Sequence, residues 1–206
     1  SCAYDASVGV TGDVTDEADN CSVGLNATYV DAVDNTDPCN IIITRTWSLV
    51  DDCGNAAADQ VQTITVEDNI APTFTIPADI TIYSDASCAY DASVGVTGDV
   101  TDEADNCSVG LNATYVDAVD NTDPCNIIIT RTWSLVDDCG NAAADQVQTI
   151  TVEDNIAPTF SIPADITIYS DASCAYDASV GVTGDVTDEA DNCSVGLNAT
   201  YVDAVD

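Results

Sequence analysis

The sequence predicts an all-β protein built from tandem antiparallel sandwiches, each 86 residues long. Three observations support this fold class: a near-perfect internal repeat, short segments of alternating apolar residues, and no convincing helical period. The segment that begins at Ser1 returns at Ser87 and at Ser173, and the first two copies differ only where Thr75 becomes Ser161. A repeat of this length has the size of a small domain and exceeds the roughly 20–50 residues of solenoid repeats.

The strands are predicted from period-two alternation, the pattern of a segment with one buried face. Asp, Asn, Gly and Pro bound these segments as turn signals, and five or more short strands joined by turns favour a sandwich. The last segment of each copy is DQVQTITV, which is rich in β-branched residues. The apolar faces of the other four segments in the second copy are Phe74, Ile76, Ala78, Ile80 and Ile82; Tyr90, Ala92, Val94 and Val96; Val109, Leu111, Ala113 and Tyr115; and Ile127, Ile129, Trp133 and Leu135, with Arg131 among them.

The stretch VEDNIAP at residues 66–72 is predicted to be a seam between modules, and it returns at residues 152–158. It contains Pro72 but no Gly, so we expect a short, stiff connection and a module spacing of about 35–45 Å. The chain begins and ends inside a module, as a window from a longer array would. The expected modules are residues 1–70, which lack a first strand, residues 71–156, which are complete, and residues 157–206, which begin a third.

The composition is strongly acidic. Each copy carries 15 Asp and Glu residues against one Arg, and the whole chain has a net charge of −35 with neither Lys nor His. This balance excludes nucleic acid as a natural partner, disfavours anionic membrane surfaces, and favours cations. Without His or Lys, acid–base catalysis would depend on pairs such as Asp51 and Asp52, which are better suited to binding metal or water. We therefore expect no enzyme.

The segments DITIYSDASC, DEADNC, TRTWSLVDDCGN and QTITVEDNIAP resemble the hyalin repeat, an immunoglobulin-like extracellular module common in large bacterial surface proteins and adhesins. The resemblance covers every copy and is most specific around the CGN and TITV…AP portions. It implies tandem Ig-like modules, a location at the cell surface, and an adhesive or scaffolding role, but it names no ligand. The seam also has a purely local likeness to the acidic linkers of cadherins.

The ten cysteines, four in each complete copy and none in a Cys-x-x-Cys pair, predict disulfides in an oxidising compartment rather than zinc sites. Cys39 and Cys53 flank a long strand, which would hold them about 45 Å apart, whereas a bridge needs Cα atoms within about 7 Å. In an Ig-like sandwich, Cys2 and Cys39 would lie at one end of a module and Cys21 and Cys53 at the other. The predicted bridges are Cys2–Cys39, Cys21–Cys53, Cys88–Cys125 and Cys107–Cys139.

Acidic residues concentrate in the loops and at the seam, which favours structural calcium over a merely solvated surface. Calcium takes about six to eight oxygen ligands, mostly carboxylates and carbonyls. A head-to-tail array would bring each seam beside the acidic loops of the next module. The predicted ligands are Glu67, Asp68, Asp102, Glu103, Asp105, Asp137 and Asp138 at the first junction, and Glu153, Asp154, Asp188, Glu189 and Asp191 at the second.

Two further features have a functional and a structural interpretation. The NAT triplets at Asn26, Asn112 and Asn198 fit the acceptor for N-glycosylation, although such triplets also arise by chance. Arg45 lies two residues before Trp47 on the same strand face, and we expect a stacked, paired Arg at the edge of the core rather than a ligand contact.

These observations predict a segment of a repetitive extracellular stalk or filament, belonging to a cell-surface adhesin and giving it mechanical reach and rigidity. Its partners would be adjacent copies of the same repeat, with a surface glycan or protein bound elsewhere, and no membrane insertion in this segment. The alternative is that the modules themselves bind a glycan, or bind another copy to form a filament.

Overall fold

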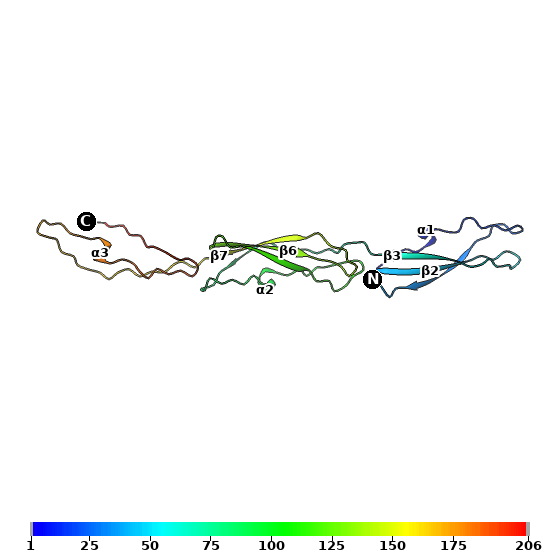
Figure 1. Ribbon diagram of the computed structural model, residues 1–206, viewed down its shortest axis with the longest axis horizontal. Helices are drawn as coiled ribbons and strands as arrows, with labels where there is room; N and C mark the ends of the chain where they lie inside the picture. The colour runs from blue at the N-terminus through cyan, green and yellow to red at the C-terminus, as the bar shows by residue number, and fades with distance from the viewer. Residues whose placement is uncertain (1, 205–206) are drawn as a thin grey trace. The chain divides into compact units, whose positions relative to one another are not determined.

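The computed structural model describes residues 2–204, and β-strands dominate it (Figure 1). No helix in this range is long and apolar enough to cross a bilayer. By its contacts the chain divides into two compact units, and the predicted module boundaries after residues 70 and 156 stay a prediction. Unit 1 comprises Ser1–Thr75, Val100–Thr114 and Trp133–Gln146, and unit 2 comprises Ile76–Asp99, Tyr115–Thr132 and Val147–Asp206.

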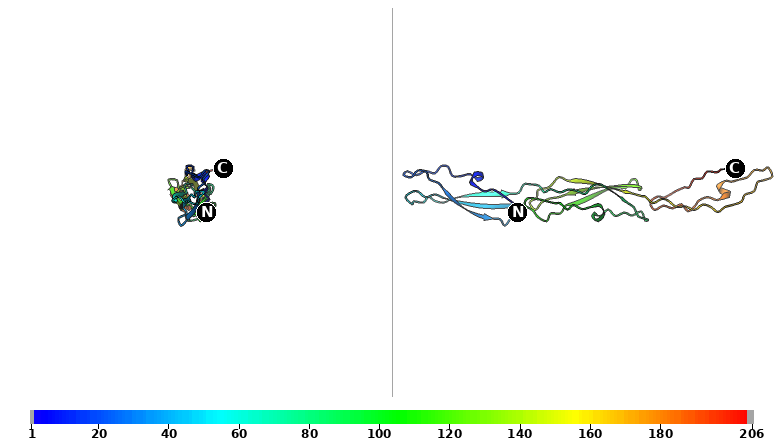
Figure 2. Two further views of the ribbon diagram at one scale, coloured as in Figure 1. Left: turned by 90° about the vertical axis from the view of Figure 1, so that its right-hand side faces the viewer. Right: turned by 180° about the vertical axis from the view of Figure 1, so that it is seen from behind.

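The first sheet lies in unit 1 and contains three antiparallel strands in the order β1-β2-β3 (Figure 2). They are β1 (Thr28–Asp34), β2 (Asn40–Ser48) and β3 (Gln60–Glu67). Alternate residues of β2 point inward, and both Ile43 and Arg45 are buried. The period-two pattern therefore predicted this strand correctly.

The second sheet has four strands, most of whose residues belong to unit 2, in the order β4-β7-β6-β5. They are β4 (Ile80–Tyr83), β5 (Thr114–Asp120), β6 (Asn126–Ser134) and β7 (Gln146–Glu153). The predicted β-rich class is confirmed, but β4 pairs with β7 in parallel, so this sheet is mixed rather than purely antiparallel. A parallel pair needs a long connection, and the chain supplies one by passing through β5 and β6 between them.

The core of the second sheet is aliphatic. Ile82, Ile129, Ile150 and Val152 form one buried cluster. They come from β4, β6 and β7, so three different strands converge on it. Ile80, Ala92 and Ile127 pack against its edge.

Three predicted strand segments are partly wrong. The segment from Phe74 enters β4 only at Ile80, and the segment around Val109 enters β5 only at Thr114. The segment that contains Val94 forms a single helical turn, α2 (Val94–Thr97), because the carbonyl of Ser93 accepts the N–H groups of Val96 and Thr97. Local hydrogen bonds therefore override the alternation around Val94. The same turn recurs as α1 (Val8–Thr11) and α3 (Val180–Thr183).

Each of the first two copies buries its one Arg, as expected. Arg131 is 1% exposed, its Nε donates to Asp117 at 2.7 Å, and its guanidinium lies 4.0 Å from the centre of the Tyr115 ring. It also donates to the Thr97 hydroxyl at 2.7 Å and to the Ala92 carbonyl at 2.6 Å. The predicted stacked and paired Arg is therefore confirmed. In the first copy, the corresponding partners of Arg45 are Asp31, Tyr29, Thr11 and Ala6.

The segment that opens the second copy is held by specific contacts. Thr73 forms a β-bridge with Ala104, the Phe74 carbonyl accepts a bond from Gln146 at 2.8 Å, and Phe74 is 8% exposed. In the first copy the residues that would correspond to this segment precede the given sequence, and unit 1 has a groove of about 570 Å³ there. Its lining residues are Asp13, Val14, Thr15, Asp16, Glu17, Ala18, Ala27, Trp47, Ser48, Leu49, Ala57, Ala58 and Gln60.

Candidate functional site

The disulfides join one copy of the repeat to the next. In unit 1, two bonds link the first copy to loops of the second, with Cα–Cα distances of 4.3 and 5.2 Å. In unit 2, a third bond repeats the first of these one period later, at 5.0 Å. The first and third bonds each join cysteines 105 positions apart in the sequence, which is one period plus 19 residues. The three bonds are Cys2–Cys107, Cys39–Cys139 and Cys88–Cys193.

The predicted pairing within each copy is therefore wrong. In the predicted module, Cys2 and Cys39 share one end and Cys21 and Cys53 share the other, and the predicted bonds join the cysteines that share an end. When copies follow one another head to tail, one end meets the opposite end of its neighbour, so the nearest thiol belongs to the next copy. Cys2–Cys39, Cys21–Cys53, Cys88–Cys125 and Cys107–Cys139 do not form among the described residues. Cys21, Cys53, Cys125 and Cys174 have no disulfide partner there, because the cysteines that the repeat would pair with them lie outside the given sequence.

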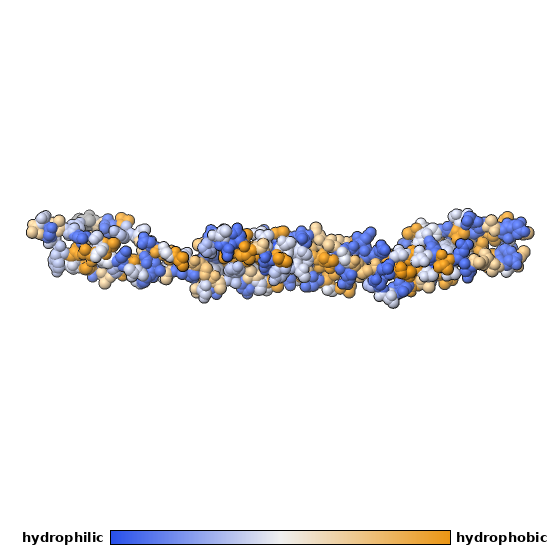
Figure 3. Space-filling view, in the orientation of Figure 1, coloured by the Kyte–Doolittle hydropathy of each residue, from blue (hydrophilic) through white to orange (hydrophobic). Residues whose placement is uncertain are grey.

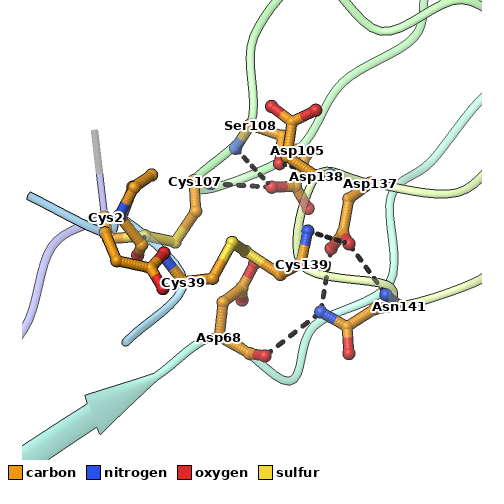
Figure 4. The surroundings of a disulfide bond; sticks show 12 residues. Cys2, Cys39, Asp68, Asp105, Cys107, Ser108, Asp137, Asp138, Cys139 and Asn141 are labelled. Atoms are coloured by element: carbon orange, nitrogen blue, oxygen red, sulfur yellow. Dashed lines mark hydrogen bonds between the residues drawn. A yellow bond between two sulfur atoms is a disulfide. The ribbon is translucent and has the colours of Figure 1, made fainter. Parts of the chain in front are cut away.

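Three of the predicted calcium ligands meet beside these disulfides, and all three belong to unit 1. Asp68 comes from the seam, while Asp105 and Asp137 come from the two acidic loops of the second copy. One carboxylate oxygen of each lies within 4.8 Å of the others. Figure 4 shows this group, which we call the acidic triad, next to the Cys39–Cys139 bond.

Backbone hydrogen bonds fix Asp105 in place. Its Oδ2 accepts the N–H groups of Cys107 at 2.8 Å and Ser108 at 2.7 Å. These bonds favour the charged form and hold the pKa of Asp105 below its ordinary value, although the nearby charge of Asp137 acts in the opposite direction. Asp105 is therefore a charged carboxylate within the triad.

Asp137 is only 7% exposed and is held by the turn that follows it. Burial raises the pKa of Asp137, but hydrogen bonds from Asn141 and from the N–H groups of Cys139 and Gly140 outweigh burial and lower it. The bonds from Asn141 measure 2.7 Å from its backbone and 2.8 Å from its side chain. Asp137 is thus a second carboxylate that stays charged at neutral pH.

Two amides tie the seam to the loops. Asn106 donates to the Asp68 carboxylate at 3.1 Å, and Asn141 donates to the Asp68 carbonyl at 3.2 Å. Asp68 Oδ2 and Asp105 Oδ1 are nevertheless buried without a hydrogen-bond partner among the described residues. An unsatisfied buried anion is costly, and a cation between these oxygens would remove that cost. Calcium, which prefers carboxylate and carbonyl oxygens, fits this set of donors.

The remaining predicted ligands of the first junction have other roles. Asp102 accepts the N–H of Thr75 at 2.8 Å, and Glu103 accepts the N–H of Ala113 at 3.2 Å. Glu67 ends β3, where it lies opposite Asn40. Asp138 binds Ser108 through its backbone N–H, and its carboxylate is not part of the triad.

The second junction, in unit 2, repeats part of this arrangement. Asn192 donates to Asp154 at 3.0 Å, as Asn106 does to Asp68, and Asp191 accepts the N–H of Cys193. The residue that would correspond to Asp137 lies beyond the given sequence, so only the counterparts of Asp68 and Asp105 are present here. The other predicted ligands are engaged locally: Asp188 with Ser161, Glu189 with Ala199, and Glu153 at the end of β7.

Three asparagines at the junctions are functional residues that the sequence pattern did not predict. Asn106, Asn141 and Asn192 each bridge a seam to a loop, and the signal for them was an Asn next to or near the Cys in both acidic loops. The predicted glycosylation residues Asn26, Asn112 and Asn198 are exposed, and their modification stays a prediction.

No family model, curated protein or solved structure matches the chain.

Proposed function

We propose that this chain is a segment of a repetitive extracellular stalk, built from Ig-like modules of the kind found in hyalin repeats and serving a cell-surface adhesin. The observation that carries the proposal is the pair of disulfides between the first and second copies. Bonds placed there stabilise the connection between neighbouring modules, which is what a stalk needs. Disulfides also persist best in the oxidising conditions outside the cell.

Calcium at the acidic triad is part of this proposal. The triad joins one residue of the seam to two loops of the following copy, so a bound ion would tie the two together at a second place. Its support is the two buried oxygens on Asp68 and Asp105 that have no hydrogen-bond partner among the described residues. Without a cation, three carboxylates this close together repel one another.

The test is calcium titration followed by X-ray scattering of the oxidised chain. Wild type should bind calcium at the first junction and scatter as a stiff rod whose modules repeat at about 35–45 Å. Replacing both loop acids, Asp105→Asn and Asp137→Asn, should abolish that site. The matched control is Asp19→Asn with Asp51→Asn, the same positions one period earlier, for which the counterpart of Asp68 would precede the given sequence. This control should keep the site.

Equal calcium binding by the two double variants would refute the triad as a calcium site. A separate result bears on the stalk itself. If the oxidised wild type scatters as a flexible coil with calcium present, the stalk is wrong whatever the titration shows.

The alternative function, in which the modules themselves bind a glycan or another copy of the chain, stays a proposal. On the face drawn in Figure 3, hydrophobic residues lie scattered among hydrophilic ones.

A further inference from the structure

The positions of the disulfides along the chain create a covalent path much shorter than the backbone. Cys2 bonds Cys107, and Cys88 bonds Cys193. Cys88 precedes Cys107 by only 19 residues. A path from Cys2 to Cys193 can therefore cross the first bond, follow these 19 residues backwards, and cross the second bond, whereas the backbone between the same ends contains 191 residues.

We infer that these bonds form a continuous tension-bearing chain, which carries load past the folded modules and prevents them from unravelling under force. This inference rests on the proposed stalk for its biological purpose. An extended residue spans about 3.5 Å, so 19 residues reach about 65 Å and 86 residues about 300 Å. Each further copy can then add no more than about 70 Å to the stretched length of the oxidised array, including its disulfide bridge.

The repeat itself shows that the path is regular. Cys2 and Cys88 occupy the same position one period apart, and so do Cys107 and Cys193. Both bonds have short Cα–Cα distances, 4.3 and 5.0 Å, and each lies within a single compact unit. The path therefore advances by one period at every junction, and each new copy adds the same 19-residue link.

The turn before each link holds its cysteine in place before any bond forms. Cys88 has φ of 60°, and the free Cys174 has φ of 61°, in the left-handed region that side chains rarely adopt. Asp85 maintains this turn by accepting the N–H groups of Ser87 at 2.8 Å and Ala89 at 2.9 Å. Because the bonded and the free cysteine share the conformation, the turn rather than the disulfide sets it.

The bond Cys39–Cys139 lies outside this path and provides the control. Removing it leaves the route from Cys2 through Cys107 and Cys88 to Cys193 intact. Removing Cys88–Cys193 instead forces the load along the 86 residues from Cys107 to Cys193.

Single-molecule pulling on the oxidised chain, with handles at its two ends, tests this inference. Between Cys2 and Cys193 the fully stretched length should be about 75 Å, and it should rise about ninefold, to about 670 Å, after reduction. Cys39→Ser with Cys139→Ser should leave the 75 Å unchanged. Cys88→Ser with Cys193→Ser should increase it to about 300 Å.

An oxidised wild type that stretches to about 670 Å would overturn the inference, as would two double variants of equal length. The result is also separable from the stalk proposal. Scattering typical of a flexible coil would refute the stalk proposal but would leave the stretched length unchanged. A stretched length near that of the reduced chain would refute the covalent path but would leave the scattering unchanged.

Discussion

Replacing both cysteines of one bond, Cys39→Ser with Cys139→Ser, is expected to lower the free energy of unfolding by about 2–4 kcal/mol. The bond closes a loop with a sequence separation of 100 residues. For a loop of that length the chain-entropy model gives about 4.7 kcal/mol, and strain in the native state usually reduces this value. The measurement is urea unfolding of the oxidised protein, in which the midpoint should fall.

The matched control for this prediction is Cys21→Ser with Cys53→Ser. These two positions correspond to Cys107 and Cys139 one period earlier, but they have no disulfide partner in this chain, so the free energy of unfolding should fall by less than about 0.5 kcal/mol. A pairing within copies predicts a large loss here, because Cys21–Cys53 would then be a bond. A large loss of stability in this control would therefore contradict the pairing between copies.

Arg131→Leu is expected to cost about 3–5 kcal/mol, because breaking a buried ion pair leaves polar groups without partners. The Asp117 carboxylate, the Thr97 hydroxyl and the Ala92 carbonyl would each lose the bond that the guanidinium donates. Lys is not an equivalent replacement, because its compact ammonium group lacks the rigid fork of donors that the guanidinium presents to these acceptors. Urea unfolding again provides the measurement.

A double variant separates lost packing from the stranded charge. Arg131→Leu with Asp117→Leu should recover most of the loss, since apolar replacement of both members of a buried pair is often nearly neutral. If Arg131→Leu alone costs less than about 1 kcal/mol, the guanidinium does not organise this edge of the core.

The strands could be predicted where apolar and polar residues alternate regularly and no local backbone hydrogen bonds favour a turn instead. In β6, Ile129 and Trp133 are buried as the period-two pattern requires, and Arg131 between them finds its carboxylate. The pattern failed around Val94, because a Ser carbonyl and a following Gly close a helical turn there. Alternation alone does not reveal a hydrogen bond from the backbone to itself over four residues.

The disulfide pairing could not be predicted for a different reason. Cysteines at the two ends of a module can pair within one copy or with the next copy, and their spacing in a single copy does not distinguish these. The loops that contain Cys107 and Cys139 lie beside the first copy, and they also supply two members of the acidic triad. In a repeat, the contacts of one copy with the next are as regular as those within it, and a single period cannot show them.

The most direct test of the pairing between copies is disulfide mapping of the unreduced protein. The copies yield identical peptides, so two exposed residues, Ala3→Ser and Val109→Ile, would serve as mass tags beside Cys2 and Cys107. After cleavage at Asp, a doubly tagged peptide that joins Cys2 to Cys107 is the predicted product. Finding the tagged Cys2 peptide joined instead to the Cys39 peptide, or to the untagged Cys21 peptide, would contradict the account.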